Sequence, residues 1–438
     1  MKIVINNVEY TAIKSLDFTE QVDILSSEIP VNEFVAELNT TDDIPVGVYA
    51  YLYDKDNNLW AKYWVVDAVR YVDEILTITC QSEILLLDRK TVPAIMYSGV
   101  TALSELTRLF AIFNLSVNVD ASLQAISING YCPEQTVRER IQQICFVIGG
   151  YVKTAFLSGN ATEIKAIDDE TITNIFSNEV FQYPQISNSD YVTGIRVLQY
   201  SFRQGQPETV DEYVQIDNGD DTFTYYIYTT QEAVITNPNA PSLAPENIIE
   251  FTDVMLINSS NFSDLLTRLS TYYFKRGEVE ADVLNDNGDY SAGHKYMLDC
   301  GNGDCAVGFM SENSFTFGYR NKSSITINQA DVVKGVKLTV NCMYEDVLKG
   351  IFKYHLPSGY GYKIQNPNIS LIETDSEDNF LRRVYSPIIW YAEGTMPSED
   401  TTITMQYRLS LEQQAGILRI FNVDNLDFDE IERVIEIE

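Results

Sequence analysis

Few residues in this sequence could do acid–base or metal chemistry. The chain has two histidines, His294 and His355, which lie 61 positions apart (355 − 294), and the HExxH pattern is absent. Serine and cysteine catalysis need a histidine beside the nucleophile, and no G-x-S-x-G, Walker A or G-x-G-x-x-G motif occurs. We therefore predict no catalytic residues, no cofactor or cofactor-binding residues, and no metal ligands.

The cysteines offer one string of chemical interest. Four residues, Gly301 to Asp304, separate Cys300 from Cys305, but no second cysteine pair completes a zinc site. A hairpin turn with a cysteine at each end is therefore favoured over a metal or redox role. We expect all the cysteines to be reduced core residues of a protein made in a cytoplasm. The full set is Cys80, Cys132, Cys145, Cys300, Cys305 and Cys342.

Two acidic, glycine-containing turns invite comparison with calcium loops. They are Asp217-Asn218-Gly219-Asp220-Asp221 and Asp286-Asn287-Gly288-Asp289. An EF-hand needs an acid five residues before the glycine, and these positions hold Val214 and Val283. Type I′ hairpin turns are the better prediction for both.

The 63 acidic residues guarantee carboxylate pairs by chance, so a glycoside hydrolase needs stronger evidence. Such enzymes hold two acids about 5–10 Å apart in a cleft, and no segment indicates one. The net charge of −33 opposes nucleic-acid binding, which needs a basic surface, and opposes docking on anionic membranes. A solvated acidic surface explains most of this charge; a wall that repels passing DNA is the sharper hypothesis.

No stretch approaches the roughly 18 apolar residues that span a bilayer, so we expect no stable membrane anchoring. The start, MKIVINNVEYTAI, alternates apolar and polar residues and reads as a strand rather than a signal peptide. Residues 48–53 and 60–66 predict a β-hairpin around the turn at 54–58, and residues 72–80 predict a further strand.

Three segments have helical spacing. Leu103, Leu106, Phe110 and Phe113 follow a possible N-cap at Thr101. Thr136 and Glu139 form a capping box for a second helix, which Gly149-Gly150 ends, followed by a hairpin of residues 151–156 and 163–167. A third helix is expected near 261–276, with Asn261 or Ser263 as its cap and Gly277 as its stop. The inward faces of the second and third helices are predicted to hold Val137, Ile141, Ile144, Cys145 and Ile148, and Leu265, Leu266, Leu269, Tyr272 and Tyr273.

Strand patterns fill most of the remainder. Residues 194–200 and 222–228 flank the first acidic turn, and further strands are expected at 278–284, 295–299, 306–310 and 314–319. The fold class is therefore mainly β with α+β inserts. We predict an N-terminal β-barrel-like domain (1–95), a small α/β insert domain (96–180), a second β-barrel-like domain with a helix (181–340) and a C-terminal β-rich accessory domain (341–438).

The order of elements resembles one known group of proteins. An N-terminal β stretch is followed by three segments in this order: YCPEQTVRERIQQICFVIGGYVKT, FSDLLTRLSTYYFKRGEVEADVL and GHKYMLDCGNGDCAVGFMSENSFTFGYRNKSSITI. This order, over residues 1–340, is similar to baseplate hub and tail-tip proteins of phage tails and of phage-derived contractile injection systems (tailocins). The resemblance implies a structural virion component in the tail, made in the bacterial host cytoplasm. It also implies a homotrimer whose two barrel-like domains per chain adapt the hexameric tail tube to a trimeric spike, with tube, spike and other baseplate proteins as partners.

Residues 341–438 depart from a minimal hub and lack a lysozyme or peptidase signature. Their aromatic residues fit a docking module for spike or baseplate, carbohydrate stacking, or an accessory domain that enlarges the trimer. A receptor- or glycan-binding tail protein is therefore the alternative function, and a cell-wall hydrolase is a third. The aromatic residues concerned are Tyr344, Tyr354, Tyr360, Tyr362, Tyr385, Trp390 and Tyr391.

Overall fold

The computed structural model describes residues 1–333 with short gaps, and the backbone of eight strands between residues 339 and 435. The gaps lie at 27, 73, 158, 169, 176–178, 182–183, 207–211, 286–289, 302–303 and 318–321. The chain forms two compact units. The first contains residues 1–174, 178–296 and 308–331, and the second contains residues 175–177, 297–307 and 332–438.

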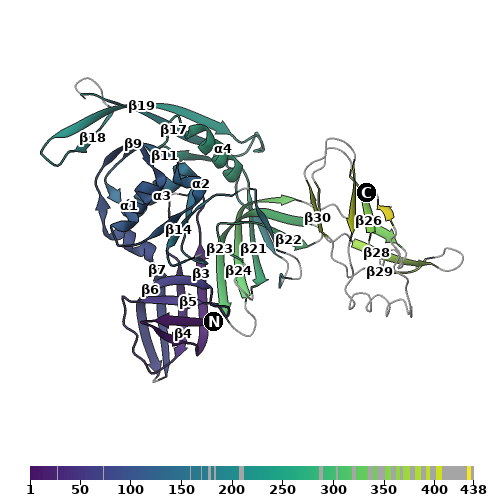
Figure 1. Ribbon diagram of the computed structural model, residues 1–438. Helices are drawn as coiled ribbons and strands as arrows, with labels where there is room; N and C mark the ends of the chain where they lie inside the picture. The colour runs from purple at the N-terminus through teal and green to yellow at the C-terminus, as the bar shows by residue number, and fades with distance from the viewer. Residues whose placement is uncertain are drawn as a thin grey trace. The chain divides into compact units, whose positions relative to one another are not determined.

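One large antiparallel sheet forms the framework of the first unit, with the strand order β16-β21-β24-β23-β3-β4-β7-β6-β5-β1-β2. It has two curled parts, β1 to β7 near the N-terminus and β16, β21, β23 and β24 (Figure 1). The two parts join where β3 pairs with β23, with Phe18 opposite Phe315. The strands are β1 (Lys2–Ile5), β2 (Val8–Tyr10), β3 (Ile13–Gln21), β4 (Glu33–Asn39), β5 (Tyr49–Tyr53), β6 (Leu59–Val72), β7 (Ile75–Ser82), β16 (Gln185–Asn188), β21 (Gly277–Leu284), β23 (Asp304–Phe317) and β24 (Lys322–Val333); β15 (Ile172–Ile175) and β22 (Lys295–Gly301) lie off this path.

The N-terminal part of the sheet has one dry face because its strands alternate apolar and polar residues. In β4, Phe34, Ala36 and Leu38 are fully buried while their neighbours are half-exposed. Trp60 packs edge-on against Phe315 with ring centroids 4.9 Å apart, which carries this core across the junction of the two curled parts. The mainly-β fold class expected from the sequence is confirmed for the first unit.

Several strand boundaries differ from the sequence prediction; β17 and β19, for example, run on to Gln204 and Thr236, past their predicted ends at 200 and 228. The first strand breaks at Asn6 and Asn7, whose φ angles of 50° and 64° make a tight turn between β1 and β2, because asparagine tolerates this left-handed backbone. β6 extends to Val72, so β7 begins three residues later than expected. Residues 306–310 and 314–319 were predicted as two strands, but β23 runs unbroken from Asp304 to Phe317.

The α/β part contains η1 (Glu83–Arg89), α1 (Ala102–Ala111), α2 (Ala121–Gln124) and α3 (Val137–Ile148). Both predicted N-caps are confirmed. The Thr101 hydroxyl accepts from Ser104 N, and Thr136 and Glu139 form the full capping box. Of the residues with helical spacing, Leu106 and Phe110 are buried, whereas Leu103 is exposed.

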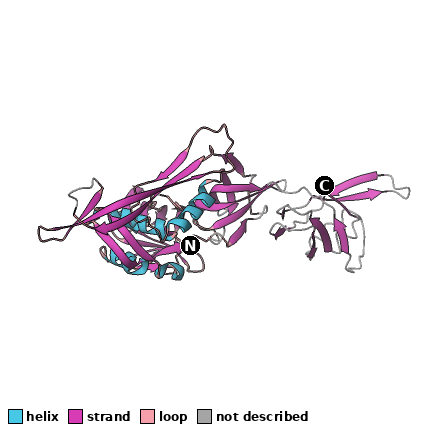
Figure 2. Cartoon of the chain, turned by 90° about the horizontal axis from the view of Figure 1, so that it is seen from above, coloured by secondary structure: helices cyan, strands magenta, loops and turns pink. Residues whose placement is uncertain are grey.

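The helices gather in one part of the first unit, as the view in Figure 2 shows. Short strands accompany them: β8 (Thr91–Val92) pairs with β12 (Gln135–Thr136), β9 (Ile95–Thr101) pairs with β11 (Ser127–Cys132), and β13 (Gly150–Lys153) and β10 (Val117–Val119) flank β14 (Thr162–Ala166). The antiparallel pairing of β13 with β14 confirms the predicted hairpin. Gly149, with φ of 76°, ends α3 in the left-handed conformation that the Gly-Gly pair predicted.

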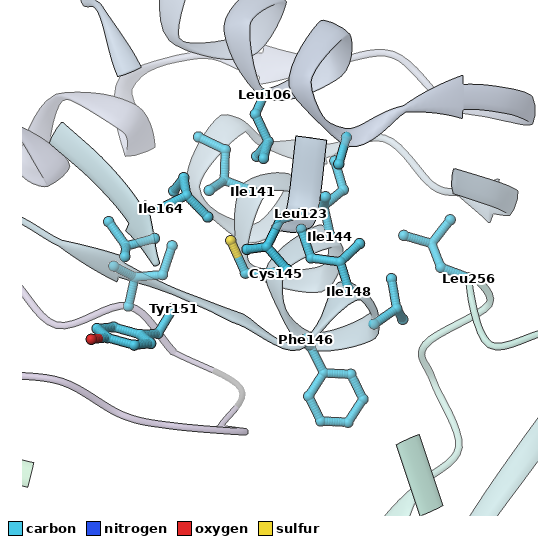
Figure 3. Packing of buried hydrophobic residues seen from close by; sticks show 14 of the residues in the cluster. Leu106, Leu123, Ile141, Ile144, Cys145, Phe146, Ile148, Tyr151, Ile164 and Leu256 are labelled. Atoms are coloured by element: carbon cyan, nitrogen blue, oxygen red, sulfur yellow. The ribbon is translucent and has the colours of Figure 1, made fainter. Parts of the chain in front are cut away.

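A single hydrophobic cluster surrounds α3 and draws on distant segments. The predicted inward face of α3 is buried, and Leu123, Ile164 and Leu256 pack around it (Figure 3). α4 (Phe262–Tyr273) contributes Leu265 and Leu269 to the same cluster, and Leu266, Tyr272 and Tyr273 pack against it. The segment 96–180 therefore shares its core with residues 195–269.

The end of α4 differs from the prediction. The helix stops at Tyr273 with Phe274 as its C-cap, and Gly277 begins β21 instead of stopping the helix. At the other end Asn261 is the N-cap residue, but its side chain serves the preceding loop, accepting from Asn258 N and donating to Leu256 O.

A separate four-stranded sheet, β18-β19-β17-β20, lies beside α4 and the β9–β11 pair (Figure 1). Its strands are β17 (Gly194–Gln204), β18 (Tyr213–Asp217), β19 (Phe223–Thr236) and β20 (Ile248–Phe251). β17 and β19 form an unbroken ladder of eleven residue pairs. This long ladder makes the sheet a firm platform at the surface of the first unit.

The second unit contains short strands in three small sheets beyond residue 338. The pairing order is β25-β28-β29, β31-β26-β32 and β27-β30. The strands are β25 (Thr339–Cys342), β26 (Ile351–Leu356), β27 (Tyr362–Gln365), β28 (Asn368–Thr374), β29 (Phe380–Tyr385), β30 (Tyr391–Gly394), β31 (Thr401–Gln406) and β32 (Glu432–Ile435).

Candidate functional site

The residues singled out for chemistry do not come together. His294 lies exposed in the loop before β22, and His355 lies in β26, where the backbone alone is described. Cys300 and Cys305 are buried on β22 and β23, which pair with each other as the predicted hairpin; its tip at 302–303 lies outside the described residues. In the part of the chain that the structure describes, no group of three His, Cys, Asp or Glu side chains could hold a metal ion.

The acidic turn between β18 and β19 is stabilised by its own side chains. Asp217 Oδ1 accepts from Gly219 N at 2.8 Å, and Asp220 Oδ1 accepts from Thr222 N at 3.2 Å. The loop is longer than the predicted type I′ turn, because the backbone bond from Asn218 N to Thr222 O encloses three residues. The second acidic turn, 286–289, lies outside the described residues.

A buried acid and a buried amine lie near each other where β3, β13 and the loop before β22 meet. Glu20 is 0% exposed; its carboxylate accepts from Ser291 Oγ at 3.0 Å and from Ala292 N at 2.8 Å. Burial raises the pKa of Glu20 to about 7, although the positive charge of Lys153 opposes the rise. Burial also lowers the pKa of Lys153, against the attraction of Glu20 and Glu163. Perturbed groups of this kind can mark active sites, but Glu20 has no surface through which to meet a substrate.

A hydrogen-bond network next to this pair ties four strands together. Asn32 Oδ1 accepts from Gln21 N at 2.8 Å, and Asn32 Nδ2 donates to Thr154 Oγ1 at 2.8 Å. Asn32 N donates to Ser82 Oγ at 3.1 Å. The buried polar groups at this junction thus position the N-terminal curled sheet against β13.

A second buried network holds the β9–β11 pair against α1 and α3. Arg140 is 0% exposed and donates to the carbonyl oxygens of Pro133 at 2.7 Å and Pro93 at 3.1 Å, and to the Tyr97 hydroxyl at 3.3 Å. Tyr97 in turn donates to Glu105 Oε1 at 2.5 Å, and Arg108 binds the same carboxylate. Arg140 and Glu105 are both buried and depend on these partners to satisfy their charges, so this network fixes the geometry of the region.

Two strands at the ends of the large sheet are candidate assembly edges. β2 and β16 are the last strands of the sheet path, and each pairs with one neighbour among the described strands. All four residues of β16 are exposed, including the apolar Ile186. Exposed edges invite pairing with another chain.

Exposed apolar side chains gather at the end of β6. Val66, Val69, Tyr71 and Val72 are 38%, 40%, 71% and 56% exposed. Single exposed apolar residues are common, but four on one strand end form a patch typical of a protein contact. Residues 67–72 of β6 extend past β5 and pair with β7, and the sequence pattern did not reveal this extension.

Comparison with known proteins rests on structure, since no protein-family model and no curated protein sequence matches this chain. A tail protein from Neisseria meningitidis MC58 superposes with a TM-score of 0.55 at 12% sequence identity, covering 75% of this chain and 95% of that one. This chain has the fold of that tail protein. Prophage tail proteins from Shewanella oneidensis (MuSo2, 43 kDa) and Listeria monocytogenes (gp18) both give TM-scores of 0.48 at 9% identity; each covers 75% of this chain, and 97% and 95% of their own lengths respectively.

No helix among the described residues is long and apolar enough to cross a membrane. The sequence prediction of element order is consistent with the shared fold. What sequence reasoning missed are the surfaces: the apolar end of β6, and an open cleft beside the β17–β19 ladder. Both consist of residues that form no motif in the sequence. Only the folded chain brings them together into a surface.

Proposed function

We propose that this chain is a structural component of a phage tail or of a related contractile injection machine, a baseplate hub or tail-tip protein without enzymatic activity. The observation that carries the proposal is the fold shared with the Neisseria meningitidis tail protein over 75% of the chain. The order of elements in the sequence supports it independently.

The proposed assembly is a homotrimer that adapts the hexameric tail tube to a trimeric spike. Two barrel-like modules, at 1–95 and 181–340, supply six copies in three chains, with 96–180 as a peripheral insert and 341–438 as an accessory module. The two curled parts of the large sheet and the outer edges of its end strands, β2 and β16, support this arrangement, because ring closure buries sheet edges. Tube, spike and other baseplate proteins are the proposed partners, and the virion tail is the proposed location.

The proposed mechanism is assembly rather than catalysis. The titratable pair with the strongest resemblance to an active site, Glu20 and Lys153, lies inside the protein, where Glu20 bonds β3 to the loop before β22. The net charge of −33 suits a surface that repels DNA, so that DNA passing through the tail does not stick.

Native mass spectrometry of the full chain tests the assembly. We expect a species of three times 49.7 kDa that persists on dilution. A monomer at assembly concentration contradicts the hub. Release of soluble fragments from purified cell walls contradicts the non-enzymatic role and would favour the hydrolase.

A further inference from the structure

We propose that the cleft beside the β17–β19 ladder binds a neutral oligosaccharide. The cleft is open to solvent and has a volume of about 550 Å³. Tyr200, Phe202 and Tyr226 line one wall. Ser98 and Asn129, from the β9–β11 pair, and Ser259 line the other.

The cleft carries no charge. None of its lining residues is Asp, Glu, Lys or Arg, in a chain in which charged residues make up 21% of the sequence. A cleft of this kind gives no counter-charge to an anion or a cation, and the surrounding acidic protein repels anions at longer range. The ligand is therefore uncharged.

The aromatic wall offers flat apolar surfaces. The β17–β19 register places Phe202 opposite Tyr228 and Gln204 opposite Tyr226, so these side chains share one face of the sheet. Phe202 and Tyr226 are half-exposed and present these surfaces. The buried Tyr200 ring supports Phe202 from within, nearly parallel to it, with ring centroids 6.2 Å apart and an interplanar angle of 13°. A pyranose ring, whose C–H groups form an apolar face, stacks on such surfaces.

The opposite wall offers hydrogen-bonding groups. Asn129 Oδ1 accepts from Gly99 N at 2.8 Å, which orients the side-chain amide and leaves its NH₂ group as a donor. The exposed hydroxyl groups of Ser98 and Ser259, together with the exposed amide of Gln204, both donate and accept. Sugar hydroxyl groups require donors and acceptors of this kind.

The walls are held in place before any ligand arrives. Asn258 Nδ2 donates to Asn129 O at 3.0 Å, and Asn258 Oδ1 accepts from Ser260 N at 2.9 Å, which fixes the loop to β11. The Tyr200 hydroxyl donates to Thr252 O. A preorganised site loses little entropy on binding. The volume also lies within the range of small-ligand sites, roughly 300–1,000 Å³, rather than that of a flat protein contact.

The experiment is calorimetric titration of the full chain with two uncharged probes, a β-linked tetramer of N-acetylglucosamine and an α-linked tetramer of glucose. We expect at least one to bind at millimolar or lower concentration, and a tetramer of galacturonic acid not to bind. Tyr226→Ala weakens binding by about tenfold, because the stacking surface is lost. Tyr225→Ala is the matched control. The Tyr225 ring lies on the face of β19 that points away from the cleft, so we expect binding to be unchanged.

Gln204→Glu provides a second variant at an exposed position, where folding is unaffected. The added charge and the lost donor weaken binding by a similar factor, and circular dichroism verifies the fold of every variant. The proposal is overturned if neither neutral tetramer binds, if Tyr225→Ala weakens binding as much as Tyr226→Ala, or if the cleft variants alter oligomer mass while sugar has no effect. The last result would assign the cleft to a protein contact. The trimer itself is tested separately by mass, so either proposal can fail alone.

Discussion

At the scale of single residues, the charged groups with the clearest effect are the ones hidden from solvent. Glu20 and Lys153 keep two ionisable groups inside the protein, and Arg140 holds three backbone or hydroxyl oxygens without exposure. Removing one member of such a set lowers the free energy of unfolding by more than the whole set adds to it, because the remaining group stays buried and unpaired. These residues specify one arrangement of the strands around them.

Glu20 makes stability depend on pH. Its pKa is about 7 in the folded chain against an ordinary 4.5, so between these values the folded state holds a proton that the unfolded state releases. Raising the pH from about 5 to 7.5 should therefore lower the free energy of unfolding by roughly 2 kcal/mol through this group. Urea unfolding of the wild type and of Glu20→Gln at both pH values measures the effect.

The Glu20→Gln variant should lose most of this pH dependence, because glutamine does not titrate. Its single side-chain oxygen can accept from Ala292 N, and its NH₂ group can donate to the Ser291 hydroxyl. Glu280→Gln, at an exposed position on β21, is the control and should behave like the wild type. An unchanged slope in Glu20→Gln would show that other groups govern the pH response.

Gly130 lets two segments approach closely. Its φ is 116°, and a Cβ added there would lie 2.5 Å from Met255 O, a backbone atom that cannot move aside cheaply. Gly47 has a φ of 82° and open space around it, so alanine there measures only the strain of a positive φ, without a steric clash. We expect Gly130→Ala to lower the free energy of unfolding by roughly 1–3 kcal/mol more than Gly47→Ala. Equal losses in denaturant melts would mean that the close approach relaxes.

At the scale of elements, α3 shows local signals and tertiary packing in agreement. Its capping box and its glycine stop set both ends, and its apolar face lies at the centre of the α/β core. α4 shows the opposite case at its C-terminus. The glycine three residues past its C-cap was read as a stop, but the chain enters β21 there because strand pairing with β24 begins at Gly277.

The capping box gives an element-scale prediction. Thr136 Oγ1 accepts from Glu139 N at 3.2 Å, and Glu139 Oε2 accepts from Thr136 N at 2.7 Å. Thr136→Ala should destabilise the chain by about 1 kcal/mol, and Thr136→Ser should retain most of the stability because serine also caps. Thermal melts followed by circular dichroism compare the two. If both variants melt alike, the box does not limit stability.

At the scale of the whole molecule, charge limits how copies of the chain meet. With a net charge of −33, two copies repel over most of their surface, so contacts gain most from apolar patches. The end of β6 is such a patch. Its residues lie on the part of β6 that extends past β5, and their exposure makes them accessible to a neighbouring chain.

Tyr71→Asp should therefore weaken the proposed trimer, since it places a charge in the apolar patch of β6. Leu243→Asp makes a similar change of an apolar residue that is 95% exposed in a loop, and it should leave the trimer intact. Sedimentation velocity over a concentration series compares the two variants with the wild type. A trimer equally stable in both variants would remove the β6 patch from the subunit contact.

Much of the local structure was determined by the sequence alone. Period-two alternation specified the strands, the residue pairs Thr136/Glu139 and Gly149-Gly150 specified α3, and the order of elements pointed to the tail-protein fold. These signals act over a few residues, so they are legible without knowing what lies nearby. The short reach of these signals also explains the errors at Asn6-Asn7 and Gly277. At each of these sites the local sequence fits both a strand and a turn or helix stop, and pairing with another strand decides between them.

The tertiary structure alone decided which distant residues meet. The pairing of β3 with β23 unites two curled parts in one sheet, and the burial of Glu20 beside Lys153 follows from contacts between segments more than a hundred residues apart. The cleft beside β17 and β19 likewise combines residues from five segments, β9, β11, β17, β19 and the loop at 258–260, none of which carries a motif. Strand pairing, burial and the shape of a cleft all depend on which residues are neighbours in space. No local pattern along the chain specifies those neighbours.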